Sequence, residues 1–171
     1  MSDHLWAGWR NAYVRGGTDD GAEIAVADGE TLFEAIARST LPEEQTLILW
    51  RGERVFAVLN RYPYTSGHLM VLPNRGVQHL TDLDDGEYDE LWRGVRLAAR
   101  AVQTAYEPHG INVGANLGRG AGAGIPDHLH VHVLPRWDGD TNFMTAIADV
   151  RVMPETLGTT WERLRAAWPA S

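Results

Sequence analysis

Histidine and apolar residues alternate between His128 and Val133, and this alternation restricts the fold more than any other feature of the chain. Side chains along a β-strand point alternately to its two faces, so the imidazoles of His128, His130 and His132 share one face. The residues between them are apolar and suit a core: Leu129, Val131 and Val133. The segment therefore predicts a strand with one face toward the core and one face lined by histidine.

Four other segments predict the remaining strands of a sheet. They are rich in apolar and β-branched residues and are bounded by turn residues: residues 46–50, 54–60, 68–73 and 111–118. The link between the first two is short and contains glycine, which favours a hairpin. A glycine-rich loop, residues 118–127, joins the fourth segment to the histidine segment. This strand–loop–strand order predicts antiparallel neighbours.

Apolar residues at helical spacing predict one long helix within residues 82–110 and a C-terminal helix within residues 154–169. Acidic residues suit the positive N-terminal end of the long helix, and Pro108 and Gly110 suit its end. Its predicted buried stripe consists of Tyr88, Leu91, Trp92, Val95, Ala99, Val102 and Tyr106.

The chain has 171 residues, which is enough for one domain with a substantial core. Its helices and strands are segregated rather than strictly alternating, which indicates the α+β class. We expect an N-terminal arm (residues 1–30), a core (about 31–137) and a C-terminal extension (138–171). Thr31 and Glu34 predict a capping box for a short helix. We interpret that helix as structural and without chemistry.

Composition excludes several classes of function. A formal net charge of −8 argues against binding to a nucleic acid polymer or an anionic membrane, although a few oriented donors can still bind a small phosphorylated ligand. The sequence contains no run of eighteen apolar residues, so it predicts no membrane-spanning helix. The absence of cysteine excludes disulfides and thiolate metal sites. The N-terminus lacks a secretory pattern, so we expect a cytoplasmic protein.

The histidine face has three interpretations. A hydrated polar face is one, although surface strands usually vary their polar residues. A metal site is the second, because His-x-His on a strand can place two ligands on one ion. Arg136 stands nearby, however, where an acidic ligand would be needed, and its charge is unfavourable beside a dication. Phosphate chemistry is the third, with one imidazole as nucleophile and a neighbouring imidazolium as donor. The upstream glycine-rich loop favours it, since backbone N–H groups approach an anion closely there.

The pattern His-Leu-His-Val-His-Val-Leu at residues 128–134 resembles the signature of the histidine triad (HIT) superfamily of nucleotide hydrolases and transferases. Residues 57–73 resemble the nucleotide-binding strand–loop–strand of that family, and residues 111–118 resemble the strand before its phosphate loop. Three segments, residues 5–14, 60–73 and 135–144, look most similar to the bacterial branch that contains diadenosine tetraphosphate phosphorylases. The resemblance implies an antiparallel sheet of about five strands with a long crossing helix and a C-terminal helix.

The same resemblance implies which residues carry the chemistry. His130 corresponds to the nucleophile, which attacks the α-phosphorus of the nucleotide and forms a nucleotidyl-histidine. His128 and His132 would orient His130 and the phosphate, and His68 corresponds to a fourth, separate histidine. Other residues correspond to nucleotide-binding positions of the family: Asn60 for the ribose, Val58 and Met70 for the base, and Asn116 for phosphate.

The residues that flank the triad depart from the family pattern. Many members have Gln followed by Ser or Thr where this chain has Gly124 and Ile125. Phosphate contacts there would therefore come from the backbone N–H groups of Ala123 and Gly124. Beyond the triad, Arg136 would hold a distal phosphate and Trp137 would stack on a second base.

The resemblance also implies the partners and the reaction. The substrate would be a dinucleoside polyphosphate similar to diadenosine tetraphosphate. A nucleoside phosphoramidase, a mononucleotide hydrolase, a nucleotide-binding sensor and a metal-dependent oxygenase are the alternatives. We expect no resident metal and no required cofactor, with Mg²⁺ accompanying the polyphosphate where it is present. We expect a homodimer, with a tetramer as the alternative.

Overall fold

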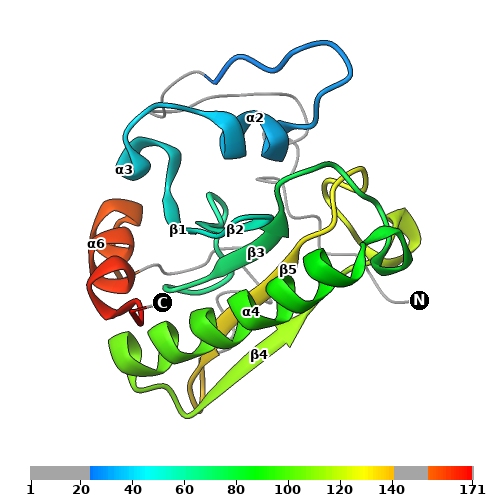
Figure 1. Cartoon of the computed structure of the whole chain (residues 1–171). Coiled ribbons are helices and arrows are strands. Elements are labelled where there is room, and N and C mark those ends of the chain that lie inside the picture. Colours follow the sequence, from blue (N-terminus) through cyan, green and yellow to red (C-terminus); the bar gives the residue numbers. More distant parts are fainter. Residues whose placement is uncertain (1–23, 141–153, 171) are drawn as a thin grey trace, which may run out of the picture.

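The computed structural model describes residues 24–140 and 154–170 (Figure 1). The N-terminal arm up to residue 23 and part of the C-terminal extension lie outside the described residues. The helices, 3-10 turns and strands follow in this order: α2 (Leu32–Arg38), α3 (Glu43–Thr46), β1 (Ile48–Arg51), β2 (Val55–Leu59), β3 (Leu69–Pro73), η1 (Leu80–Asp82), α4 (Asp85–Tyr106), β4 (Gly110–Gly114), η2 (Arg119–Ala121), β5 (Val131–Arg136) and α6 (Leu157–Ala167).

The five strands form one sheet in the order β1-β2-β3-β5-β4, and every neighbouring pair is antiparallel. The predicted α+β class, the antiparallel sheet and the β1–β2 hairpin are confirmed. Two strands are shorter than predicted. β4 ends at Gly114, and β5 begins only at Val131, so His128 and His130 lie in the segment that enters the strand. Cross-strand pairing sets in at Val71 opposite Val131 and at Met70 opposite His132.

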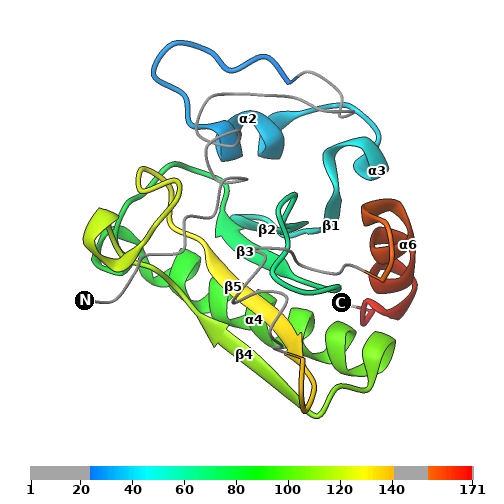
Figure 2. The same cartoon turned by 180° about the vertical axis from the view of Figure 1, so that it is seen from behind.

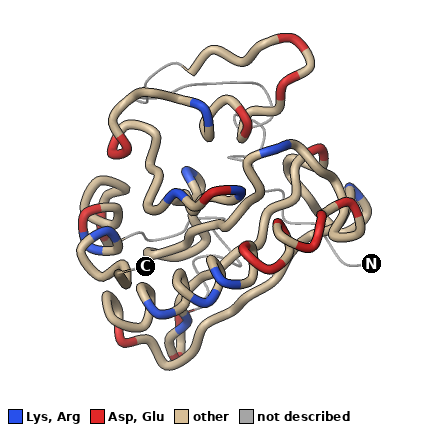
Figure 3. The backbone as a smooth tube through the Cα atoms, viewed as in Figure 1, with Lys and Arg blue, Asp and Glu red and all other residues tan. Residues whose placement is uncertain are grey.

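Helix α4 crosses one face of the sheet and closes the main core (Figure 2). Asp84 caps its N-terminus, and Asp84 and Glu87 form a reciprocal capping box. Figure 3 shows acidic residues gathered on the first half of α4 and basic residues on the second half, which complements the helix dipole. None of the described helices, α4 included, is long and apolar enough to cross a membrane.

The predicted buried stripe of α4 is partly wrong. Tyr88 and Trp92 are 48% and 40% exposed, whereas Ala98 and Ala101 are fully buried. The reason is close approach of the helix to the sheet. A Cβ atom on Gly94 would lie only 2.9 Å from the Val71 side chain, so small residues occupy the contact line. The large aromatic residues are therefore displaced to the edge of the interface.

The histidine face of the sheet is covered rather than hydrated. Helix α2 packs there, away from α4, and forms a second apolar cluster with the sheet (Figure 1). The cluster consists of Phe33, Ile48, Phe56, Val58, Met70 and Leu72. The interpretation of this face as a solvated surface is therefore wrong, because the helix buries it.

Helix α6 protects the outer edge of β1. The indole Nε1–H of Trp161 donates to the carbonyl of Ile48 at 2.8 Å, and Arg165 donates to the carbonyl of Leu49 at 2.5 Å. Leu164 is fully buried in the main core. The predicted C-terminal helix is thus confirmed, and it satisfies carbonyls that an open sheet edge would expose to pairing with other chains.

The corrected α4 interface leads to a test of stability. Leu91→Ala should lower the free energy of unfolding by about 2–5 kcal/mol, because it removes a fully buried side chain and leaves a cavity. Tyr88→Ala, at a half-exposed position, should cost less than about 1 kcal/mol. Urea titration followed by circular dichroism measures both. Equal losses would contradict the orientation of α4.

Candidate functional site

Four histidines meet between the sheet and helix α2. His128, His130, His132 and His68 are all buried, with relative exposures of 0%, 7%, 9% and 1%. The ring centroids of His130 and His132 are 4.9 Å apart, and those of His68 and His132 are 5.0 Å apart. The structure therefore brings together the three histidines of the alternating segment and the separate histidine 60 positions before it.

The backbone selects one tautomer of His130. Its Nδ1 lies 2.8 Å from the carbonyl oxygen of His128, which can only accept a hydrogen bond. The neutral ring must therefore carry its proton on Nδ1 and leave Nε2 with a lone pair. Phe33 flanks the ring at a centroid distance of 5.8 Å. The arrangement presents an oriented nucleophilic nitrogen in a buried site.

A second hydrogen-bond chain selects the tautomers of His68 and His132. The backbone N–H of Tyr64 donates to His68 Nδ1 at 3.0 Å, so His68 carries its proton on Nε2. That Nε2–H lies 3.0 Å from His132 Nδ1 and donates to it. Neutral His132 then carries its own proton on Nε2. This chain makes His132 Nε2 a hydrogen-bond donor, whereas the His128 carbonyl leaves His130 Nε2 as an acceptor.

Protein groups occupy both ring nitrogens of His128. Nε2 lies 2.9 Å from the carbonyl oxygen of Pro73, and Nδ1 lies 2.7 Å from the hydroxyl of Thr31. His128 therefore acts on its surroundings through its backbone carbonyl, which holds His130, and not through a ring nitrogen directed at a ligand. Thr31 belongs to the capping box of α2, a segment that we interpreted as structural and without chemistry. Its contact with His128 places this cap beside the histidine cluster.

Burial keeps the triad uncharged. Desolvation lowers the pKa of His128 and of His130 below the ordinary value of 6.5. Desolvation, with a smaller contribution from the charge of His130, lowers the pKa of His132 to about 4. All three rings are therefore neutral near pH 7. The expected imidazolium donor is absent from this state, because the covering helix removes the solvation that a cation needs.

An apolar pocket of about 100 Å³ has Phe33 in its wall, and the Phe33 ring also contacts the rings of His128 and His130. It brings together three of the predicted nucleotide-binding residues, Val58, Asn60 and Met70, with Phe33 of α2. Its other lining residues are Ile24, Leu32, Ile36, Gln45, Thr46, Leu47, Leu59 and Arg61. Asn60 also shapes the following loop, because its Oδ1 accepts the backbone N–H of Tyr62 at 3.0 Å. The amide therefore borders the pocket and fixes a turn.

The glycine-rich loop offers fewer donors than expected. The backbone N–H of Ala123 donates to the carbonyl of Gly118 at 3.3 Å, so it is engaged within the loop itself. The N–H of Gly124 has no hydrogen-bond acceptor among the residues that the structure describes. Ile125 packs against the second apolar cluster. Asn116 is half-buried and lies between β4 and η2.

Arg136 and Trp137 lie away from the histidines, and their expected contacts with a distal phosphate and a second base stay predictions. Six residues of extended chain separate Arg136 from His130, which corresponds to about 20 Å. Arg136 makes a bidentate ion pair with Asp140 at 2.6 Å. The Trp137 ring packs edge-on against Tyr106 of α4, with the centroids 6.1 Å apart. The strand carries both residues past the site.

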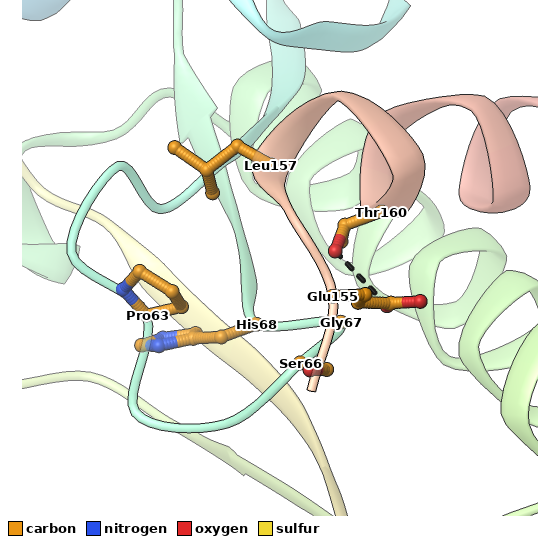
Figure 4. Close-up of a pocket in the computed structure, with 7 residues that line it drawn as sticks. All are labelled: Pro63, Ser66, Gly67, His68, Glu155, Leu157 and Thr160. Atoms are coloured by element: carbon orange, nitrogen blue, oxygen red, sulfur yellow. Dashed lines mark hydrogen bonds between the residues drawn. The ribbon is translucent and has the colours of Figure 1, made fainter. Parts of the chain in front are cut away.

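A second cavity, of about 170 Å³, borders His68 where the loop before β3 faces the start of α6. Figure 4 shows Pro63 and His68 from that loop opposite Leu157 and Thr160, and the hydroxyl of Thr160 donates to Glu155 at 3.0 Å. Within residues 24–140 and 154–170, no set of three or more His, Asp or Glu side chains is arranged to hold a metal ion.

Comparison with known proteins gives consistent matches. The HIT domain matches residues 42–139. AP-4-A phosphorylase of Mycobacterium tuberculosis (strain H37Rv) is 48% identical over 128 residues, which cover 75% of this chain and 66% of that protein, just under two thirds. Bis(5'-nucleosyl)-tetraphosphatase [asymmetrical] of Schizosaccharomyces pombe is 32% identical over 93 residues, 54% of this chain and 50% of that protein.

Solved structures share the fold as well. A hypothetical histidine triad nucleotide-binding protein from Sulfolobus tokodaii superposes with a TM-score of 0.65 and 26% identity, covering 80% of this chain and 91% of that one. The predicted resemblance, including the likeness to the diadenosine tetraphosphate branch, is thereby confirmed. The domain match spans more than half of the chain and contains the whole alternating histidine segment, and so the chain belongs to the HIT domain family.

Proposed function

We propose that this chain is a nucleotide hydrolase or transferase that cleaves a dinucleoside polyphosphate at its α-phosphate through a covalent nucleotidyl-histidine at His130. The observation that carries the proposal is the tautomer of His130. Its Nδ1–H is held by the His128 carbonyl, so the Nε2 lone pair is available at near-neutral pH. A buried, oriented and uncharged imidazole has the properties that a nucleophile for phosphorus needs.

The pocket supports a consistent placement of the substrate. One nucleoside would occupy the apolar pocket, with its base beside Val58 and Met70 and its ribose near Asn60. The α-phosphate would then lie over His130. The Nε2–H of His132 and the backbone N–H of Gly124 are candidates to donate to its oxygens, whose charge grows in the transition state.

The reaction would proceed in two displacements. His130 Nε2 attacks the α-phosphorus, a P–N bond forms, and the bond to the bridging oxygen breaks so that the rest of the polyphosphate leaves with the electron pair. The Nδ1–H remains on the His128 carbonyl and stabilises the charged ring. An acceptor then attacks phosphorus and the P–N bond breaks, which restores neutral His130. No cofactor enters these steps, and Mg²⁺ would act on the polyphosphate rather than as a resident ion.

The relatives support the substrate class but differ in the acceptor. One is named a phosphorylase, whose acceptor would be inorganic phosphate, and the other a tetraphosphatase, whose acceptor would be water. Incubation with diadenosine tetraphosphate, with and without inorganic phosphate, decides between them. ADP plus ATP formed only with phosphate means a phosphorylase, whereas AMP plus ATP formed in water means a hydrolase. No turnover of any nucleotide would favour a binding sensor.

The role of His130 has a direct test. His130→Ala should abolish turnover while nucleotide binding, measured by calorimetry, survives, because the apolar pocket stays intact. His109→Ala is the matched control, since His109 is exposed and lies outside the histidine cluster. Substantial activity in His130→Ala would remove it as the nucleophile.

The lowered pKa values predict the acid limb of the pH profile. The nucleophile must be neutral, and burial keeps His130 neutral to a lower pH than an exposed histidine. The value of kcat/KM should therefore persist below pH 6.5 and fall as the pH approaches about 4, where His132 protonates as well. Circular dichroism at each pH checks the fold, because unfolded histidines bind protons first and stability falls in the same direction. Half-loss of activity at or above pH 6.5 would contradict the prediction.

We also propose a homodimer formed through the open side of the sheet. β4 pairs only with β5 among the described strands, and Val113 and the nearby Leu117 are 44% and 42% exposed. An unpaired strand edge beside exposed apolar side chains favours association with a second copy. Light scattering should give twice the mass of the chain, and Val113→Lys should reduce it to that of the monomer. A mass of four chains would indicate the tetramer, and a monomeric wild type would contradict the proposal.

A further inference from the structure

The capping box of α2 reaches the histidine triad. Glu34 Oε2 accepts the backbone N–H of Thr31 at 2.8 Å and its hydroxyl at 2.9 Å, and Glu34 Oε1 accepts the N–H of Gly76 at 2.8 Å. The same Thr31 hydroxyl lies 2.7 Å from Nδ1 of His128, 97 residues further along the chain. A helix cap ordinarily ends at its own backbone, so the contact with a buried imidazole needs a separate explanation.

Counting protons shows that this contact has two arrangements. The carbonyl of Pro73 requires a proton on His128 Nε2. When His128 is neutral, its Nδ1 is bare, and the single hydroxyl proton of Thr31 must turn toward it and away from Glu34. When His128 is protonated, Nδ1–H donates to Thr31, and the hydroxyl proton turns to the Glu34 carboxylate. Both arrangements satisfy the two ring nitrogens of His128, but only the second also keeps the hydrogen bond from the Thr31 hydroxyl to Glu34.

We propose that Glu34 and Thr31 are positioning residues that form a proton relay to His128. The relay stabilises a proton that His128 takes up from the solvent when a phosphate group brings negative charge to His130. The inference deepens the proposed nucleotidyl transfer and rests on it. Because the carbonyl of His128 accepts the Nδ1–H of His130, the relay also fixes the ring that would attack phosphorus.

The surroundings of His128 identify what sets its charge. Among the described residues, the titratable groups that face it are Glu34 from α2 and His130 from its own segment; β3 contributes the uncharged Pro73 carbonyl, and Phe33 contributes an aromatic edge at 5.4 Å. Burial lowers the pKa of His128, while the Pro73 hydrogen bond and the charge of Glu34 raise it. Backbone hydrogen bonds from Thr31 and Gly76 lower the pKa of Glu34, so its carboxylate is ionised near neutral pH.

The chain contains matched controls for both relay residues. Glu87 occupies the same capping-box position at the start of α4 that Glu34 occupies in α2, but its carboxylate pairs with Arg75. Thr156 caps α6 with its hydroxyl, and among the residues that the structure describes it makes no hydrogen bond to a histidine. Glu87→Gln and Thr156→Val therefore remove a capping group of the same kind as Glu34→Gln and Thr31→Val without touching the site.

The decisive measurement is the titration of His128 by ¹⁵N NMR of labelled histidine, in the free protein and with AMP as the probe. Glu34→Gln should lower the pKa of His128 relative to the wild type, because the charge of Glu34 raises it, and Glu87→Gln should leave it unchanged. AMP should raise the pKa of His128 in the wild type and raise it less in Glu34→Gln. An unchanged His128 titration in Glu34→Gln would overturn the relay.

Measurements of kcat, KM and the pH dependence of kcat separate a positioning role from a purely structural one. Thr31→Val should lower kcat about tenfold with little change in KM, and Thr31→Ser, which keeps the hydroxyl, should restore it. In Glu34→Gln, the alkaline limb of kcat should shift to lower pH. Equal losses in Thr31→Val and Thr156→Val would overturn the relay. If wild type turns over no nucleotide, the proposed function fails, while the titration of His128 in the free protein still decides the relay.

Discussion

The hydrogen bond between His130 Nδ1 and the His128 carbonyl is the interaction on which the site depends. A backbone carbonyl cannot donate, so it removes the ambiguity between the two neutral tautomers of imidazole. It holds its position because His128 is anchored at both ring nitrogens, to the end of β3 and to the cap of α2. The register of β5, the cap of α2 and the tautomer of His130 are thus coupled. A shift of one residue in β5 would break the hydrogen bonds of His128 to Pro73 and Thr31 and the hydrogen bond of His130 to the His128 carbonyl.

Alternation along a strand made most of the fold predictable, because side-chain direction follows directly from it. The core face of residues 129–133, the hairpin and the antiparallel neighbours follow from local patterns alone. The buried face of α4 was less accessible to prediction. Apolar character at helical spacing identified Tyr88 and Trp92 as core, but close approach of the helix at Gly94 favours small residues on the contact line. That distance depends on the tertiary structure.

The candidate site shows the same limit. Val58 and Met70 lie on β2 and β3, and Asn60 and His68 flank these strands, so the strand order that the family resemblance implies brings the four residues close together. The contact of Thr31 with His128 spans 97 residues, and no local pattern distinguishes a cap that ends at its helix from one that also binds an imidazole. Arg136 and Trp137 stay predictions for a distal phosphate and a second base, because an extended strand separates its ends by about 3.3 Å per residue and so carries them away from the histidines.

The two faces of the sheet have different roles: one forms the main core and the other carries the histidine cluster. The α4 face is a continuous apolar core and needs no polar partner. The α2 face combines an apolar cluster with four histidines, and every ring there has a hydrogen bond from the protein at a nitrogen. Burial without such partners would cost the fold several kcal/mol for each polar ring. The first turn of helix α2 therefore contributes in two ways. Phe33 covers His128 and His130 with an apolar ring, which favours their neutral forms. Thr31 supplies a hydrogen-bond partner for buried His128, which reduces the cost of burying that ring.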